Sequence, residues 1–315
     1  VLTLHDAWLL SGHCAHSFDC ERWKTGCGSC PDLTIYPSIR RDATAYNWTR
    51  KQSIFSQSRL YISAPSRWLM CKVEESMLCP AMVESKVIPN GVDLSIFRPG
   101  NNKMARAELG ISPDKKVVLC AAHGVRENVW KDYATMRMAI EEIGRRLHGE
   151  EVLFVVLGEE GDMEQVGPAQ IRFIPFTNDP DTVARYYQAA DVYLHAARAD
   201  TFPNTVIEAL ACGLPVVATA VGGIPEQVDD SNTGFLVPSG DVKAMADSLT
   251  RVLSDGHLQR RLGREAAHIA QTRFGLRRQV TAYLEWFEEI LETRRGQTPD
   301  TRRPTSVLSE AGEAV

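Results

Sequence analysis

Two carboxylates, Asp200 and Glu208, stand on either side of a segment that is typical of a helix start. The apolar run 191–195 predicts a strand, and the loop after it leads to Pro203. Proline is favoured in the first turn of a helix, because its missing N–H would have no partner there. The free N–H groups of such a turn and the positive end of the helix dipole attract anions. The segment therefore predicts a phosphate site, with an ordinary surface helix as the alternative on spacing alone.

The elements that must position these groups alternate along the chain. Strand patterns lie at 116–122, 152–157, 171–174, 191–195 and 216–218. Helical patterns lie at 131–148 and 179–190, from Pro203 onward, and between 242 and 291. Hydrophobic strands separated by helices predict a parallel sheet covered on both faces. In such sheets ligands bind at the carboxyl ends of the strands, where the segment from Asp200 to Glu208 begins.

This region resembles the family-4 retaining glycosyltransferases. The stretch from Asp200 to Glu208 is similar to the E-x7-E region of that family, with Asp in place of the usual first Glu. Other segments carry the same resemblance in the same order: 87–93 with Phe97 and Pro99, 221–226, and 234–238. The resemblance implies the α/β GT-B fold, in which two Rossmann-like domains face a cleft. It also implies transfer of a sugar from a nucleotide-sugar donor.

The resemblance implies roles for residues of the donor site. Glu208 would hold the ribose hydroxyls, and Asp200 would contact the donor sugar, although its side chain is one methylene shorter than that of the usual Glu. The remaining donor-binding residues of this stretch are Phe202, Pro203, Asn204 and Thr205. Of these, Asn204 and Thr205 would offer backbone N–H groups to a phosphate.

Two cations, Arg126 and Lys131, lie in the predicted loop between a strand and a helix. Breaking the glycosidic bond leaves negative charge on a nucleoside diphosphate, and fixed cations stabilise that charge most in the transition state. By resemblance, Arg126 and Lys131 occupy the positions of the family's pyrophosphate-binding Arg and Lys. Solvated cations near a helix start are the alternative.

His5 follows the apolar strand pattern 1–4. Members of the family place a histidine at the end of such a strand, facing the donor sugar, so the resemblance gives His5 a catalytic or sugar-binding role. A neutral imidazole donates from one nitrogen and accepts at the other, which suits sugar hydroxyls. A structural histidine is the alternative. The segment 66–68 is a weaker candidate for the cleft wall, and residues 63–67 can equally cap a helix.

Four cysteines are concentrated in the segment 13–31, which forms a predicted Cys-rich loop: Cys14, Cys20, Cys27 and Cys30. Four thiolates can close a tetrahedral structural zinc site, which would staple a loop too short for its own core. His13 or His16 can replace one ligand. Two disulfides, unliganded thiols and an iron–sulfur cluster are the alternatives. Similar loops occur in bacterial polysaccharide-building transferases, to which the chain has a weaker resemblance.

The 315 residues are long enough for two domains. We expect a partial acceptor-side domain at 1–95, because the chain opens inside a strand pattern and lacks the preceding βα units of the family. A donor-binding domain is expected at 96–275, and a helix returning to the first domain at 276–293. The segment 294–315 has little apolar content and predicts a disordered tail.

A formal net charge of −5 argues against a nucleic-acid surface, and no apolar run is long enough to span a membrane. We expect a cytoplasmic enzyme of polysaccharide biosynthesis, with peripheral attachment at the inner membrane face as an option. Its expected partners are a UDP- or GDP-sugar donor and a saccharide or lipid-linked acceptor, with no metal needed for transfer. The alternatives are a nucleotide-sugar-binding module, an inactive fragment, and a zinc-dependent nucleic-acid binder.

Overall fold

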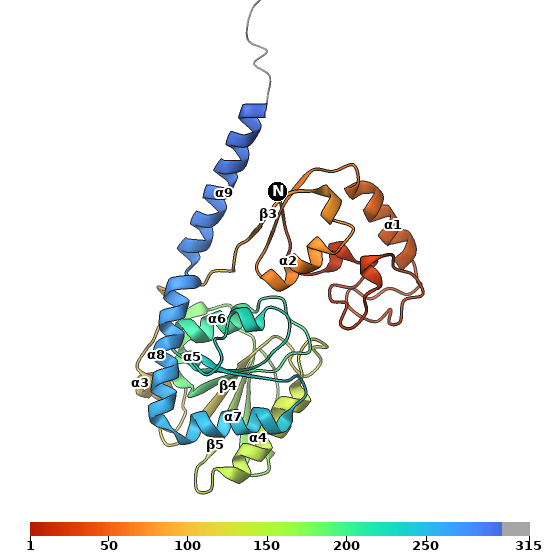
Figure 1. Cartoon of the computed structure of the whole chain (residues 1–315). Coiled ribbons are helices and arrows are strands. Elements are labelled where there is room, and N and C mark those ends of the chain that lie inside the picture. Colours follow the sequence, from red (N-terminus) through yellow and green to blue (C-terminus); the bar gives the residue numbers. More distant parts are fainter. Residues whose placement is uncertain (298–315) are drawn as a thin grey trace, which may run out of the picture. The chain divides into compact units, whose positions relative to one another are not determined.

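The computed structural model describes residues 1–297, which contain two sheets (Figure 1). The smaller sheet has the order β1-β2-β3 and is entirely parallel. Its strands are β1 (Leu2–Thr3), β2 (Leu60–Ala64) and β3 (Met82–Val87). The larger sheet has the order β10-β9-β8-β4-β5-β7-β6.

The larger sheet contains every strand predicted between residues 116 and 218. Its members are β4 (Lys116–Ala121), β5 (Val152–Leu157), β6 (Glu164–Val166), β7 (Ala169–Ile174), β8 (Val192–His195), β9 (Val216–Thr219) and β10 (Gly234–Val237). All neighbouring strands are parallel except β6, an unpredicted short edge strand that runs antiparallel to β7. Along β4, Val117 and Leu119 enter one core and Val118 and Cys120 the other, so both faces are buried.

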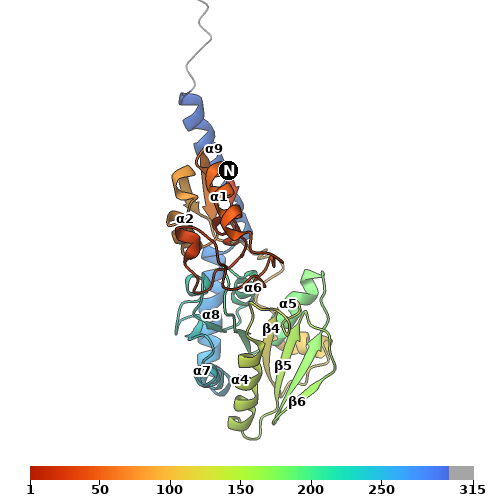
Figure 2. The ribbon, with the colours of Figure 1, turned by 90° about the vertical axis from the view of Figure 1, so that its right-hand side faces the viewer.

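Helices cover both faces of this sheet, as predicted. They are α3 (Asn102–Glu108), α4 (Tyr133–Arg146), α5 (Pro180–Ala189), α6 (Asn204–Ala211), α7 (Val242–Ser254) and α8 (Gly256–Arg273). Buried side chains of α4 and α7 share one core, and those of α3, α5 and α6 share the other. Figure 2 shows α4 beside β4 and β5, with β6 at the sheet edge. Helix α4 begins two residues later than predicted, because Asp132 caps it by accepting from the N–H of Thr135.

The smaller sheet has its own core, with α1 (Thr44–Phe55) and α2 (Arg67–Glu74) beside it. Trp23 and Trp48 are buried in this core, where the indole of Trp48 donates to the carbonyl of Trp23. Helix α2 begins after Ser66, whose hydroxyl accepts from the N–H of Leu69 at 3.3 Å. The predicted cap in the segment 63–67 is therefore confirmed.

The last helix, α9 (Leu276–Gln297), is longer than predicted. Residues 294–297, predicted as the start of a disordered tail, are helical, because the helix continues past the last apolar position of its pattern. The rest of that predicted tail lies outside the described residues. The domain boundaries and the return of this helix to the first domain stay predictions. None of the helices within residues 1–297 combines the length and the apolar character needed to cross a membrane.

A buried ion pair joins three segments of the larger domain. Arg106 of α3 donates to the carboxylate of Asp191 at 2.7 Å and to the carbonyl of Ala189 at 2.9 Å. The same carboxylate accepts from the N–H of Val117 in β4. Because the Arg106 side chain is only 5% exposed, removing it leaves a largely buried carboxylate without its cation.

We therefore expect Arg106→Leu to lower the free energy of unfolding by about 3–5 kcal/mol. The matched control is Arg185→Ala, which breaks an ion pair with Glu108 of similar length, 3.0 Å, whose side chains are 49% and 50% exposed. This control should cost less than about 1 kcal/mol. Urea denaturation followed by circular dichroism measures both. Equal losses in the two variants would contradict the structural role of Arg106.

Candidate functional site

The larger sheet has a topological switch point between β4 and β8. The chain places β5, β7 and β6 on one side of β4 and then returns to place β8, β9 and β10 on the other. Ligands of such sheets bind outside the carboxyl ends of the strands at this point. A cavity of about 390 Å³ lies there, which we call the switch-point cavity. It is lined by the loops after β4 and β8 and by residues of the N-terminal segment.

The switch-point cavity brings together part of the predicted site. The predicted residues that line it are His5, Lys131, Asp200, Phe202 and Asn204. The other predicted donor residues do not line it: Arg126, Pro203, Thr205 and Glu208. The donor roles predicted for all nine residues stay predictions.

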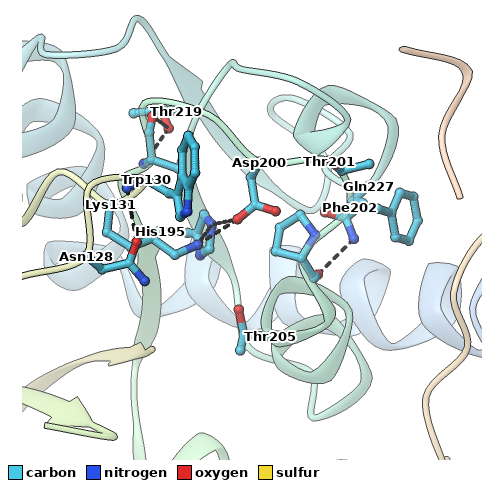
Figure 3. Close-up of polar contacts among 12 residues, drawn as sticks. Asn128, Trp130, Lys131, His195, Asp200, Thr201, Phe202, Thr205, Thr219 and Gln227 are labelled. Atoms are coloured by element: carbon cyan, nitrogen blue, oxygen red, sulfur yellow. Dashed lines mark hydrogen bonds and ion pairs between the residues drawn. The ribbon is translucent and has the colours of Figure 1, made fainter. Parts of the chain in front are cut away.

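Asp200 is the centre of a buried polar cluster in this cavity. Lys131 Nζ lies 2.6 Å from Asp200 Oδ2 and 3.1 Å from His195 Nε2. His195 Nε2 lies 3.3 Å from the same carboxylate oxygen, and Figure 3 shows both partners pointing at it. His195 is the last residue of β8, and Lys131 precedes α4, so the cluster joins the two strands of the switch point.

Charge and burial set the protonation of this cluster. Burial alone would raise the pKa of Asp200, but its contacts with His195 and Lys131 outweigh burial and hold that pKa well below its ordinary value. Burial and the nearby Lys131 charge lower the pKa of His195 to about 4. At neutral pH Asp200 is therefore a carboxylate and His195 a neutral imidazole. The neutral ring of His195 lowers the pKa of Asp200 by donating its proton from Nε2 to Asp200 Oδ2.

Backbone hydrogen bonds hold the two loops that carry the cluster. The N–H of Asp132 donates to the carbonyl of Ala196 at 3.1 Å, and the N–H of Arg198 donates to the carbonyl of Trp130 at 2.8 Å. Thr219, at the end of β9, fixes Ala197 of the loop after β8, because its hydroxyl accepts from the N–H of Ala197 and donates to the carbonyl of Ala197. The positions of Lys131 and Asp200 are thus set by main-chain pairing.

The loop after β9 packs against the backbone of the site through two adjacent glycines, Gly222 and Gly223. Gly222 has φ +58°, and a Cβ there would lie 1.7 Å from the carbonyl oxygen of Asp200. A Cβ at Gly223 would lie 2.0 Å from the carbonyl oxygen of Thr201. Any side chain at either position would displace the backbone that presents Asp200.

Helix α6 begins beside the cavity. Pro203 is its N-cap and makes no side-chain cap bond, so the predicted first-turn proline lies one position before the helix. The amide of Gln227 donates to the carbonyl of Pro203 at 3.0 Å and fixes the helix start (Figure 3). The side-chain amide of Asn90 donates to Asn204 Oδ1 at 3.0 Å. The first N–H groups of α6 have no intrahelical acceptor, as the predicted phosphate site requires.

Glu208 lies one turn inside α6 and has a partner that sequence analysis did not identify. The hydroxyl of Tyr187 in α5 donates to Glu208 Oε2 at 2.9 Å and lies 3.2 Å from the carbonyl oxygen of Thr205. Burial raises the pKa of Glu208, and the hydrogen bond from Tyr187 offsets only part of that shift. Tyr187 therefore orients the carboxylate that is predicted to bind ribose.

Arg126 lies apart from Lys131. Its Nε donates to Glu159 Oε1 at 2.9 Å, its guanidinium lies over the ring of Phe173, and it also contacts the carbonyl of Glu160. Glu159 follows β5, so the structure pairs Arg126 with the neighbouring strand rather than with the switch point. Binding of pyrophosphate by Arg126 would require this pair to open.

A second carboxylate, Glu226, joins the two parts of the site. Its oxygens accept from the backbone N–H groups of Arg67 at 2.7 Å and Trp68 at 2.8 Å, at the start of α2. A negative charge at a helix N-terminus is favourable because it satisfies free N–H groups and opposes the helix dipole. The segment 66–68, a weak sequence candidate for the cleft wall, thus contacts Glu226 of the larger-sheet region through its backbone.

The Cys-rich loop gathers its four predicted cysteines around one small cavity, together with His13. His13 Nε2 lies 3.3 Å from Cys30 Sγ, and burial raises the pKa of Cys27 to about 11. All eight cysteines of the chain are free. Among residues 1–297, no group of three or more His, Cys, Asp or Glu side chains is arranged to hold a metal ion, so zinc stays a prediction.

His16, the other alternative zinc ligand, lines the switch-point cavity instead of the cysteine cavity. Trp130 and Asn128, from the loop before α4, line the same cavity and were also not predicted. His195 was recognised only as part of an apolar run, although its place at the end of a central strand could have marked it. No local signal marks His16, because its partners are distant in sequence.

A larger hollow of about 670 Å³ lies at the opposite end of the sheet. Asp191 and Pro215, which precede β8 and β9, line it with residues of α8. Volume alone would favour this hollow, but it lies at the amino ends of the strands, where ligands of open α/β sheets do not bind. The switch-point cavity is therefore the better candidate.

Comparison with known proteins identifies the family. The model of the family described as glycosyl transferases group 1 matches residues 101–269, more than half of the chain. The chain belongs to this family, and the resemblance predicted from the sequence is confirmed.

Two curated relatives show how much of a longer protein the chain matches. It is 36% identical over 228 residues to a D-inositol 3-phosphate glycosyltransferase of Saccharomonospora viridis, covering 67% of this chain and 51% of that protein. It is 33% identical over 207 residues to a protein of the same name from Mycobacterium bovis, covering 61% and 41%. The chain thus spans about half the length of the curated relatives it matches.

Solved structures confirm the fold. Sucrose-phosphate synthase from Thermosynechococcus elongatus has a TM-score of 0.64 at 21% identity, covering 81% of this chain and 65% of that one. HepE from Anabaena, solved in complex with UDP-glucose, has a TM-score of 0.63 at 19% identity, covering 78% and 68%. The predicted α/β GT-B fold is confirmed by these likenesses.

The buried imidazole of His195 makes stability depend on pH. In the unfolded chain this histidine takes up a proton below about pH 6.5, whereas the folded chain resists protonation down to pH about 4. The stabilisation that neutral His195 gives the folded chain is therefore complete above the unfolded pKa and is lost as the pH falls from that value toward the folded pKa. Between about pH 7 and about pH 5 we expect this loss to lower the free energy of unfolding by about 2 kcal/mol.

Urea denaturation of the parent and of His195→Gln at both pH values measures this effect. The glutamine variant keeps a polar side chain but has no proton to gain, so its loss of stability should be smaller by about 2 kcal/mol. Asp200 stays ionised across this window in the folded chain and does not contribute. Identical pH dependence in the two proteins would contradict a neutral buried His195.

Proposed function

We propose that this chain transfers a sugar from a nucleoside-diphosphate sugar to a saccharide or lipid-linked acceptor, with retention of anomeric configuration. The observation that carries the proposal is the cluster of Lys131, Asp200 and His195 in a cavity at the switch point of a group 1 glycosyl transferase. The start of α6 lies beside this cluster and supplies N–H groups suited to a phosphate.

The place of each residue in the fold determines which part of the donor we assign to it. The nucleotide lies along the switch point, with its ribose hydroxyls at Glu208 and its phosphates between the start of α6 and Lys131. The sugar lies in the switch-point cavity, which His5 and Asp200 both line. HepE from Anabaena, solved with UDP-glucose and with UDP, has this fold and supports a uridine or comparable nucleotide donor.

Lys131 supplies the charge that departure of the sugar requires. As the glycosidic bond breaks, negative charge grows on the phosphate that leaves, and a cation fixed beside it favours the transition state. Lys131 is fixed, because Asp200 holds its ammonium group and only 13% of its side chain is exposed. Asp200 remains a carboxylate beside the sugar, where it can stabilise positive charge at the anomeric carbon.

Calorimetric titration with UDP, GDP and ADP tests the donor site without an acceptor. We expect one nucleotide to bind best, and both Lys131→Ala and Glu208→Gln to weaken its binding by about tenfold or more, since each removes a hydrogen bond that involves a charged group. The matched control is Lys243→Ala, which removes a cation whose side chain is 82% exposed on α7. It should bind like the parent.

Failure of a folded parent to bind any of the three nucleotides would overturn the proposed donor site. Equal affinities in the parent and both site variants would overturn the assignment of Lys131 and Glu208. Incubation of the bound nucleotide sugar with the chain then separates an enzyme from a binding module, because only an enzyme releases free nucleoside diphosphate above the rate seen without protein.

A further inference from the structure

His16 enters the switch-point cavity from a part of the chain that has no other place in the proposed chemistry. It belongs to the Cys-rich loop, yet it lines the cavity that Lys131 and Asp200 also line. The loop approaches the donor-side domain through two rings, since Phe18 stacks on Trp130 at 5.4 Å between ring centroids. The loop thus forms part of the cavity wall.

The imidazole of His16 is oriented from three sides. Its ring stacks on Trp68 of α2, with 5.4 Å between centroids and 25° between planes. It packs in a tilted arrangement against Trp130, also at 5.4 Å. Its Nε2 lies 3.3 Å from the hydroxyl oxygen of Thr201, the residue next to Asp200. These contacts fix the plane of the ring and the direction of both nitrogens.

The second ring nitrogen of His16 is left available to a ligand. Within residues 1–297, Nδ1 makes no hydrogen bond, and His16 lines the switch-point cavity although only 8% of the residue is exposed. The cavity beside it also presents His5, Asp6 and Asn128. A fixed nitrogen among other polar groups suits a ligand with many hydroxyls, because each hydroxyl both donates and accepts.

We propose that His16 binds a hydroxyl of the transferred sugar through Nδ1 and so contributes to the choice of sugar. This inference rests on the proposed function, because it needs the donor sugar to lie in the switch-point cavity. Thr201, Trp68 and Trp130 act as positioning residues, since they hold the ring in place. The Cys-rich loop is then a specificity element, in addition to any structural role of its cysteines.

Two substitutions of His16 distinguish the role of Nδ1 from that of Nε2. Asparagine places a polar atom where Nδ1 stands and cannot reach Thr201, whereas glutamine places one near Nε2 and offers nothing at Nδ1. For each protein, the dissociation constants of UDP-glucose and UDP are measured by calorimetry, and their ratio reports on the sugar alone. GDP-mannose and GDP serve as the pair if the parent prefers GDP.

In His16→Gln we expect the ratio of the sugar-nucleotide constant to the nucleotide constant to rise about three- to tenfold, the effect of one lost hydrogen bond. The constant for the nucleotide alone should stay within about twofold of the parent, because His16 does not reach the phosphates in this arrangement. In His16→Asn the ratio should stay closer to the parent's than to that of the glutamine variant.

Phe18→Leu is the matched control, because it perturbs the same loop and its contact with Trp130 without changing a polar group. It should leave the ratio unchanged. If His16 serves only to pack the loop, His16→Gln and Phe18→Leu will have the parent's ratio, and the inference is overturned while the donor site stands. If the parent binds no nucleotide, the proposed function fails and the inference fails with it.

Discussion

The site depends on the cost of burying a carboxylate. Asp200 is largely enclosed, and an ionised carboxylate in that position is unfavourable unless a cation and hydrogen bonds compensate for lost water. Lys131, from the loop after β4, and His195, at the end of β8, supply that compensation. The backbone pairing between the loops after β4 and β8 is what brings these partners within reach, so the sheet order and the charge cluster require each other.

Sequence analysis was most successful where the signal is local. The alternation of strands and helices is written in runs of apolar residues, and the gathering of Lys131, Asp200 and Asn204 follows once those strands are parallel. The pairing of Arg126 with Glu159 could not be read in this way, because it depends on the side-chain direction of a loop after a neighbouring strand. The edge strand β6 was missed because three residues carry too little periodicity.

The roles of His195 and His16 could not be predicted from the sequence, for two different reasons. His195 ends an apolar strand, where a histidine reads as core, and only the charges of Lys131 and Asp200 give it a chemical context. His16 lies among cysteines and was grouped with them as a metal ligand, yet its side chain contacts Thr201 in the other domain. In both cases the partner far along the chain, rather than the residue itself, determines the role.

The contact of Glu226 with α2 limits which substitutions in evolution can break the junction between the two halves of the protein. Within residues 1–297 its carboxylate accepts from main-chain N–H groups alone, those of Arg67 and Trp68, so this contact places no demand on the identity of either side chain. Any sequence that forms a helix start at this place offers the same two donors. This one junction is therefore preserved whatever side chains stand at positions 67 and 68, and only the backbone of that helix start is required.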